Sequence, residues 1–270
     1  MHPVLFRFET PGFLTGLFPE VITIYSYGAL IALGAIMGYF YTSYSAKKEL
    51  NISSDHVIDL MIYVIIAAVI GGRFFVFFEK PGYYFGNPAN MFKLSSQGFV
   101  FYGSLIFAIP TMLLFFKWKK IPTLAMLDIM AFTGLTVHTF GRMGCFAAGC
   151  CYGKVHSGFP SIVFDHPNCA AKPLGEPLHP TQLYSVFMLL SIMAILFYLK
   201  PRKKFDGQLF LIYLGLYAFG RSIIEIFRGD IARGFVIEEV LSNSQLISIL
   251  FVAVVAFFYV RLSKRGLKRS

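Results

Sequence analysis

The sequence predicts an all-α, polytopic integral membrane protein with seven transmembrane helices, and three observations lead to this fold class. Residues of the set AVILMFWYC make up 56% of the 270 residues. Charged residues make up 14%, whereas about 25% is usual in soluble domains. Apolar runs of about 20 residues recur along the chain, and that is the length a helix needs to cross a bilayer. Disorder is excluded, because its signature is low hydrophobicity.

Seven apolar runs follow one another, each long enough for one span. They cover residues 21–44, 57–78, 98–116, 124–146, 180–199, 207–227 and 244–262. A polar stretch follows each run. One residue from each of these stretches, in chain order, is Lys47, Lys80, Lys117, Gly149, Lys200, Arg228 and Lys264. No link is long enough to separate two domains, so we expect a single integral membrane domain over residues 1–270.

We do not expect the first run to be a signal peptide, because it is too long, comes too late, and lacks a basic n-region and a small-residue cleavage site. A short segment precedes it. Its apolar residues suit a short segment at the membrane interface. They are Phe6, Phe8, Phe13, Leu14, Leu17 and Phe18.

The distribution of Lys and Arg predicts the orientation. Fourteen of the 24 lie at Arg261, in the tail beyond it, or in the links 45–56, 117–122 and 200–206. Seven lie on the opposite side, at Arg7, Lys80, Lys93, Lys154, Lys172, Arg228 and Arg233. The positive-inside rule therefore predicts an outside N-terminus and a cytoplasmic C-terminus. The net charge of +10 then marks the cytoplasmic side, and no nucleic-acid partner is expected.

Three arginines remain, and each falls inside an apolar run. Arg73, Arg142 and Arg221 each follow a glycine, and each lies toward the outer end of an even-numbered run. Arginine at membrane depth is expensive and usually faces the bundle interior or a wet cavity. Its planar fork suits phosphate, so we expect a site for an anionic phospholipid of the outer leaflet. The alternative is snorkelling, or an ion pair such as Arg221 with Glu225.

The fourth run ends in small residues that allow close approach of another backbone or a ligand. His138 lies one helical turn before Arg142 on the same face. Near an arginine a histidine stays neutral and is a candidate base. The alternative is a hydrogen-bonded structural histidine.

The four cysteines all lie on the predicted outer side. Their spacing matches no zinc ribbon, so no metal site and no cofactor are expected. A disulfide between Cys169 and either Cys150 or Cys151 would tie the loop 152–179 to the helix end. The open alternatives are a thiol that handles an acyl or lipid group, with Cys145 also available, or a Cys/His metal site with His156, His166 or His179.

Six sequence motifs carry a family resemblance. They are Met1-His2-Pro3, Ile24-Tyr25-Ser26-Tyr27-Gly28, Gly71-Gly72-Arg73, Gly141-Arg142-Met143-Gly144, His179-Pro180-Thr181-Gln182-Leu183-Tyr184, and the run from Gly220 through Arg221 and Glu225 to Arg228. In this order they resemble the prolipoprotein diacylglyceryl transferase family. The resemblance implies transfer of a diacylglyceryl group from phosphatidylglycerol to the cysteine thiol of a lipoprotein precursor, releasing glycerol phosphate. It also implies a bacterial cytoplasmic (inner) membrane and an active site toward the outer leaflet.

By this resemblance Arg142 and Arg221 are the essential pair, and Tyr27 and Tyr217 line the site. The full expected set is catalytic Arg142, Arg221, His138 and Tyr102, with lipid binding by Arg142, Arg221, Arg73, Tyr27, Gly103 and Tyr217. His138 as the base is our own hypothesis, because Tyr102 stands where the family has the histidine of a His-Gly-Gly motif.

The chain departs from the family pattern at its centre. Cys145 stands where the family usually has asparagine, Cys150 where it has an acidic residue, and Ser185 where it has glutamate. These changes keep one alternative open, a diverged paralogue that uses the same lipid with another acceptor. An anion or lipid transporter is a second alternative, although no convincing inverted repeat supports it. A structural lipid-binding subunit is a third.

Overall fold

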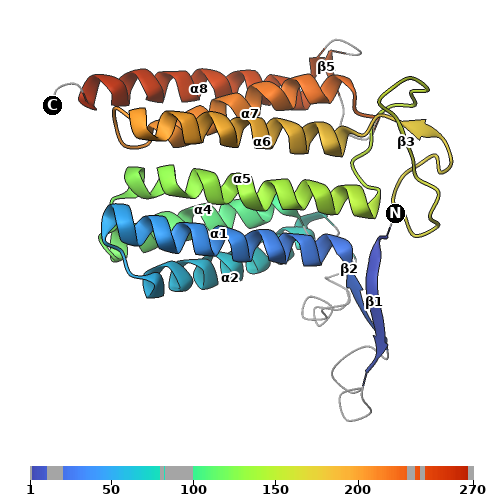
Figure 1. The fold of residues 1–270 in the computed structure, drawn as a ribbon, viewed down its shortest axis with the longest axis horizontal. Helices are drawn as coiled ribbons and strands as arrows, with labels where there is room; N and C mark the ends of the chain where they lie inside the picture. Colours follow the sequence, from blue (N-terminus) through green and yellow to red (C-terminus); the bar gives the residue numbers. More distant parts are fainter. Residues whose placement is uncertain are drawn as a thin grey trace. The chain divides into compact units, whose positions relative to one another are not determined.

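The computed structural model describes residues 2–10, 21–79, 82, 100–229, 235–237 and 241–266. Within these ranges the chain is mostly helical, with seven long helices (Figure 1). They are α1 (Ser26–Leu50), α2 (Ser54–Glu79), α4 (Phe101–Trp118), α5 (Thr123–Ala148), α6 (Thr181–Leu199), α7 (Gln208–Ile226) and α8 (Asn243–Gly266). A 3-10 turn, η3 (Lys200–Arg202), continues α6.

Five of these helices are long and apolar enough to cross a membrane, namely α2, α5, α6 with η3, α7 and α8. The apolar part of α4, Tyr102–Trp118, is shorter. The helical fold class is therefore confirmed, while the count of seven spans, their orientation and the single-domain organisation stay predictions.

The start of the first predicted span is wrong. Residues 21–25 form strand β2 (Val21–Tyr25), which pairs antiparallel with β1 (Val4–Glu9), because β-branched and aromatic residues suit a strand. Helix α1 begins at Ser26, whose backbone N–H donates to Pro3 O at 3.1 Å. Of the predicted interfacial segment, Phe6 and Phe8 lie exposed in β1. The other members, Phe13, Leu14, Leu17 and Phe18, lie outside the described residues.

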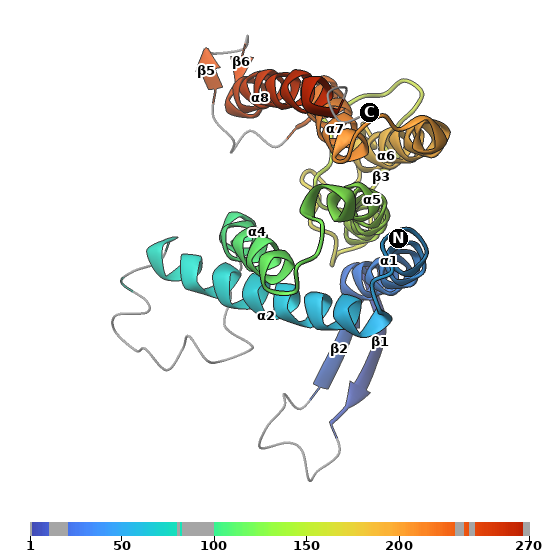
Figure 2. The same ribbon diagram turned by 90° about the vertical axis from the view of Figure 1, so that its left-hand side faces the viewer.

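The chain forms two compact units, and each is described by itself. Unit 1 comprises Met1–Tyr41 and Leu127–Ser270, and unit 2 comprises Thr42–Met126. In unit 1, Figure 2 shows α6, α7 and α8 side by side. The core there joins α5, α6 and α7 through Ala131, Phe132, Leu135, Leu189, Ile192, Leu196 and Leu209.

Helix α1 approaches α5 closely in unit 1 because two small residues face it. A methyl group on Gly34 would come 2.8 Å from Phe140 Cβ, and one on Gly38 would come 2.8 Å from Thr133 Cγ2. This spacing of small residues is common where membrane helices pack. It holds α1 against the middle of α5.

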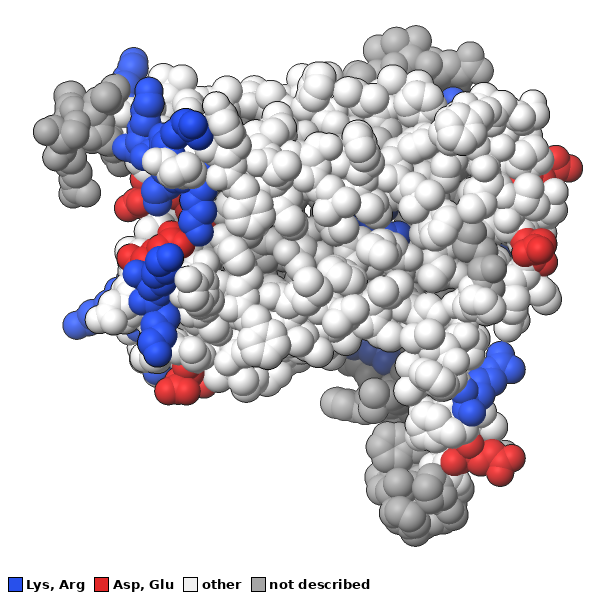
Figure 3. Space-filling view, in the orientation of Figure 1, with Lys and Arg blue, Asp and Glu red and all other residues white. Residues whose placement is uncertain are grey.

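On the face shown in Figure 3, most acidic and basic side chains lie at the helix ends, and the flanks between them carry almost no charged groups. At one such end, Asp128 accepts hydrogen bonds from the backbone N–H groups of Gly207 at 2.9 Å and Phe210 at 3.0 Å. Lys203 pairs with the same carboxylate at 3.1 Å. These bonds satisfy donors that the start of α7 leaves open and lock α7 in register with α5.

A folded loop follows α5 and leads to α6. Strands β3 (Ile162–Val163) and β4 (Pro177–Leu178) pair antiparallel, and Phe164, Cys169, Ala171 and Leu178 form a small buried core. Two further short strands, β5 (Phe235–Ile237) and β6 (Leu241–Ser242), pair before α8. The loop therefore has a core of its own at the end of α5 where the candidate residues gather.

Candidate active site

Arg142 and His138 meet on α5, as their spacing predicts. The Arg142 Nε–H donates to His138 Nε2 at 3.3 Å, so this nitrogen of the imidazole carries no proton. Among the described residues, Arg142 forms no ion pair with a carboxylate and no hydrogen bond other than the one to His138. Its two Nη groups are therefore available to an anion.

Tyr217 and Arg221 bring α7 to the same place. The rings of Tyr217 and His138 lie 5.0 Å apart between centroids, and Arg221 follows Tyr217 by one helical turn. Both guanidinium groups lie close enough to His138 to act on it electrostatically. Folding thus gathers His138, Arg142, Tyr217 and Arg221, which the sequence could relate only in pairs along single helices.

Glu225 pairs with Arg221 from the next turn of α7. Arg221 Nη1 and Glu225 Oε2 lie 2.5 Å apart, and the side chains are 13% and 8% exposed. The two atoms are nevertheless not aligned for a hydrogen bond. The carboxylate therefore holds Arg221 in place by charge while hydrogen-bonding capacity remains for a ligand.

Tyr27 lies in the first turn of α1 and faces the C-terminal end of α5. A methyl group at Gly144 would come 3.0 Å from its Cδ2. Tyr27 lines an open groove of about 600 Å³ together with Cys150, Ala148 and Ala170. It interacts electrostatically with Arg142. Tyr27 therefore lies near Arg142 and faces an apolar groove, while its part in lipid binding stays a prediction.

The remaining predicted residues, Arg73, Tyr102 and Gly103, belong to unit 2. Arg73 lies on α2, and Tyr102 is 72% exposed at the start of α4. Gly103 and Gly71 contact each other's backbones, so that a methyl group on either would overlap the carbonyl of the other. Close packing of α2 on α4 explains the absence of a side chain at Gly103.

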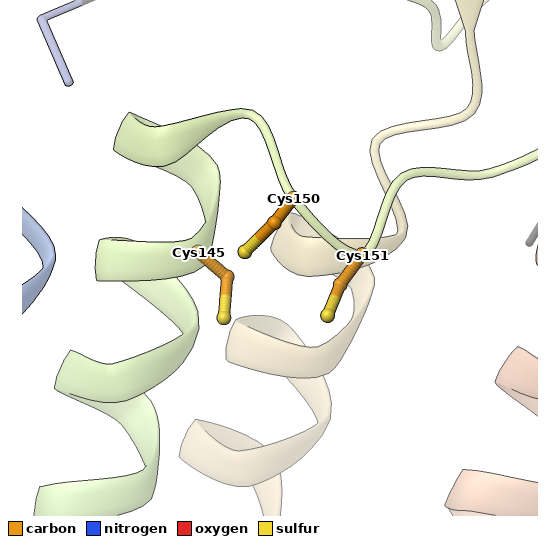
Figure 4. Close-up of side chains that lie close together, drawn as sticks. All are labelled: Cys145, Cys150 and Cys151. Carbon is orange, nitrogen blue, oxygen red and sulfur yellow. The ribbon is translucent and has the colours of Figure 1, made fainter. Parts of the chain in front are cut away.

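Three cysteines converge at the end of α5, and we call them the thiol cluster: Cys145, Cys150 and Cys151. Their sulfur atoms lie within 4.8 Å of one another, and Figure 4 shows them turned toward a common centre. Gly149, with φ of +70°, ends the helix and turns the chain back. Among the described residues, this is the one group of three or more His, Cys, Asp or Glu side chains placed to share a metal ion.

Neighbouring side chains hold the cluster from outside. Thr181 Oγ1 donates to Cys151 O, and Gln182 Nε2 donates to Cys150 O, each at 2.7 Å. Hydrogen bonds from Cys145 and Cys150 and the nearby Arg228 lower the pKa of Cys151, although burial opposes this. The same network raises the pKa of Cys150. The thiol cluster thus has a buried arginine, Arg228, beside it.

The predicted disulfide is absent, because all four cysteines are free thiols. Cys169 packs instead in the core of the loop 152–179, against Gly149 and Phe164, while the cluster thiols face one another. The loop histidines do not join the cluster. His156 and His179 stack at 4.0 Å between centroids, and His166 accepts from Asn168 N.

Sequence reasoning did not group Cys145, Cys150 and Cys151 as one set of ligands, nor single out Arg228 or Gln182. The available signal was the glycine after the helix, since a chain reversal at Gly149 returns the next two residues toward the preceding turn. Spacing rules for zinc ribbons do not cover this geometry.

Comparison with known proteins places these features in context. A family model described as prolipoprotein diacylglyceryl transferase matches residues 16–261. The chain is similar to the phosphatidylglycerol–prolipoprotein diacylglyceryl transferase of Clostridium tetani, with 35% identity over 98% of both chains. It is also similar to the proteins of that name from Finegoldia magna, 31% identical over 92% of this chain and 94% of the relative, and Dehalococcoides mccartyi, 30% identical over 88% and 90%.

Proposed function

The chain belongs to the prolipoprotein diacylglyceryl transferase family, and from that premise we propose the reaction that it catalyses. A diacylglyceryl group moves from phosphatidylglycerol to the cysteine thiol of a lipoprotein precursor, and glycerol phosphate leaves. The observation that carries this proposal is the convergence of Arg142 and Arg221, from α5 and α7, on His138. Two guanidinium groups beside one histidine, of which only Arg221 has a carboxylate partner, suit a phosphate that gains charge.

Arg142 and Arg221 would act on the leaving group. Cleavage of the carbon–oxygen bond turns a phosphate monoanion into a dianion, so fixed positive charge stabilises the transition state more than the bound lipid. Arg142 would bind the phosphate through its guanidinium fork, and in turning toward the phosphate its Nε would leave His138. Glu225 keeps Arg221 oriented without filling its hydrogen-bonding capacity.

His138 is the proposed base for the attacking thiol. Its Nε2 accepts from Arg142 before substrate binds, so this lone pair becomes free only when Arg142 turns toward the lipid phosphate. Deprotonation would then follow lipid binding. Tyr217 packs against the His138 ring and would hold it in position.

The same proposal places the protein in a bacterial cytoplasmic membrane, with its N-terminus outside and the site toward the outer leaflet. Support comes from the greater number of Lys and Arg in the links 45–56, 117–122 and 200–206. As the family resemblance implies, Arg73 on α2 and Gly103 on α4 are proposed to bind lipid, and Tyr102 on α4 is proposed to be catalytic.

The test is a reconstituted reaction. Purified protein in phosphatidylglycerol vesicles receives a peptide with a lipoprotein-type cysteine, and mass spectrometry follows the peptide. We expect a thioether-linked diacylglyceryl adduct, and none with a matched serine peptide. Release of glycerol phosphate without a peptide adduct would favour the diverged paralogue, and ion flux with neither product would favour a transporter.

A further inference from the structure

The dimensions of the thiol cluster fit one metal ion. A zinc–sulfur bond is about 2.3 Å, which separates two sulfur ligands by about 3.8 Å in a tetrahedral site. The three sulfur atoms lie at most 4.8 Å apart, so an ion at their centre would be within about 2.8 Å of each. A movement of about 0.5 Å per sulfur completes the coordination, and rotation about the side-chain bonds supplies it.

The backbone around the cluster is held in a conformation that a cysteine does not favour. Cys151 has φ of +63°, a left-handed conformation that costs about 1–2 kcal/mol outside glycine. Two side chains of α6 compensate by binding the carbonyls of Cys150 and Cys151. A cysteine at a position better suited to glycine points to a use for its sulfur.

The charge around the cluster also suits a metal–thiolate group. Three thiolates and one divalent ion carry a net charge of −1. Arg228, which is buried, bonds the Cys151 sulfur, and Arg142 lies one turn before Cys145 on α5. The amide oxygen of Gln182, fully buried at the start of α6, has no hydrogen-bond partner in the described structure.

We propose that Cys145, Cys150 and Cys151 bind one Zn²⁺ ion whose fourth coordination position takes the thiolate of the acceptor cysteine. No fourth His, Cys, Asp or Glu joins the cluster within the described residues, and sites with three protein ligands keep a position open. Cys150 lines the groove beside Tyr27, which gives the acceptor a route. This inference rests on the proposed function.

The zinc site would activate the acceptor thiol, a function for which Tyr102 is a poor substitute for the family's motif histidine. A zinc-bound thiol loses its proton readily, so the proton passes to His138 or water. The bound sulfur then forms a bond to the glyceryl carbon of the lipid. The carbon–oxygen bond to phosphate breaks, and its electron pair leaves with glycerol phosphate. No oxidant or reductant is consumed.

The first measurement is the metal content of the full chain, purified without chelator under reducing conditions. We expect about one zinc per chain, retained in the matched control Cys169→Ser, whose thiol lies in the loop core. The zinc content of Cys151→Gly should be at least tenfold lower than that of the wild type. That variant relieves the left-handed backbone, so it should fold, which its helix content and melting temperature check. Wild-type protein without stoichiometric zinc, or Cys151→Gly that retains it, would overturn the proposal.

The second measurement uses Co²⁺ in place of zinc and follows the sulfur-to-cobalt absorption band. A cysteine peptide should intensify this band, and a serine peptide should leave it unchanged; no response to the cysteine peptide overturns the inference. Transfer at the full rate by metal-free protein also overturns it, while the proposed function stands. Cobalt ligation by the peptide without any adduct would leave the metal site standing and reject the proposed function.

Discussion

Replacing Arg142 by lysine isolates the contribution of the guanidinium fork from that of the charge. In the structure the Arg142 Nε–H donates a hydrogen bond to His138 Nε2 at 3.3 Å, and its two Nη groups remain for phosphate. Lysine has a single nitrogen and cannot bind two phosphate oxygens with the fork geometry of a guanidinium group. Arg142→Lys therefore keeps the positive charge and loses at least one bond to the leaving group.

The expected effect follows from that count. A hydrogen bond to a charged group contributes about 1.5–3 kcal/mol. Because 1.4 kcal/mol is a factor of ten in rate, the loss of one such bond lowers kcat/KM by about 10- to 150-fold. Most of the loss should appear in kcat, since the charge on phosphate grows only as the bond breaks.

The assay is the initial rate of peptide adduct formation in phosphatidylglycerol vesicles. The matched control is Arg202→Lys, at the other end of the helices, where the guanidinium stacks on Tyr198 and donates to its carbonyl. It should change the rate less than twofold. If Arg142→Lys also stays within twofold of wild type, Arg142 does not bind the leaving phosphate and the mechanism is refuted.

Three further predictions address His138 as the base, His179 in the loop 152–179, and the packing of α2 on α4 at Gly103. His138→Gln can still accept from Arg142 but cannot take a proton, so turnover should vanish while phosphatidylglycerol binding persists; full activity would exclude a base role. Burial, and then the charges of a neighbouring histidine and lysine, lower the pKa of His179. The contribution of neutral His179 to the free energy of unfolding should therefore be fully present above about pH 6.5 and be lost as the pH falls. Hydrogen exchange in the loop should speed up on acidification in wild type but less in His179→Asn, and equal acceleration in both would contradict this. Gly103→Ala should lower the free energy of unfolding by about 1–3 kcal/mol through overlap with Gly71. Gly28→Ala, which meets nothing within 4 Å, should leave the melting temperature unchanged, and equal effects of the two would show that packing is not the cause.

The helices could be predicted because each is formed by one continuous stretch of sequence. A run of about 20 apolar residues identifies a helix in a membrane protein whatever surrounds it. The first run misled because Val21–Tyr25 is as apolar as a helix but pairs with β1. That choice depends on a partner strand outside the run, and composition alone does not reveal it.

The site could be predicted only where its residues share a helix. Arg142 and His138, or Arg221 and Tyr217, are one turn apart, so helical periodicity relates them. The meeting of the two pairs depends on how α5 packs on α7, which the sequence does not encode locally. The thiol cluster was missed for the same reason, since the turn at Gly149 and the two bonds from α6 arrange it.

The most direct test of the central claim counts both products of one reaction. Phosphatidylglycerol carrying different isotopes in its diacylglyceryl and glycerol phosphate parts is given to the protein with the cysteine peptide, and mass spectrometry quantifies both labels. The account predicts equal molar amounts of peptide adduct and free glycerol phosphate, falling together in Arg142→Lys and Arg221→Lys. Unequal amounts, or glycerol phosphate released at the wild-type rate by either variant, would contradict it.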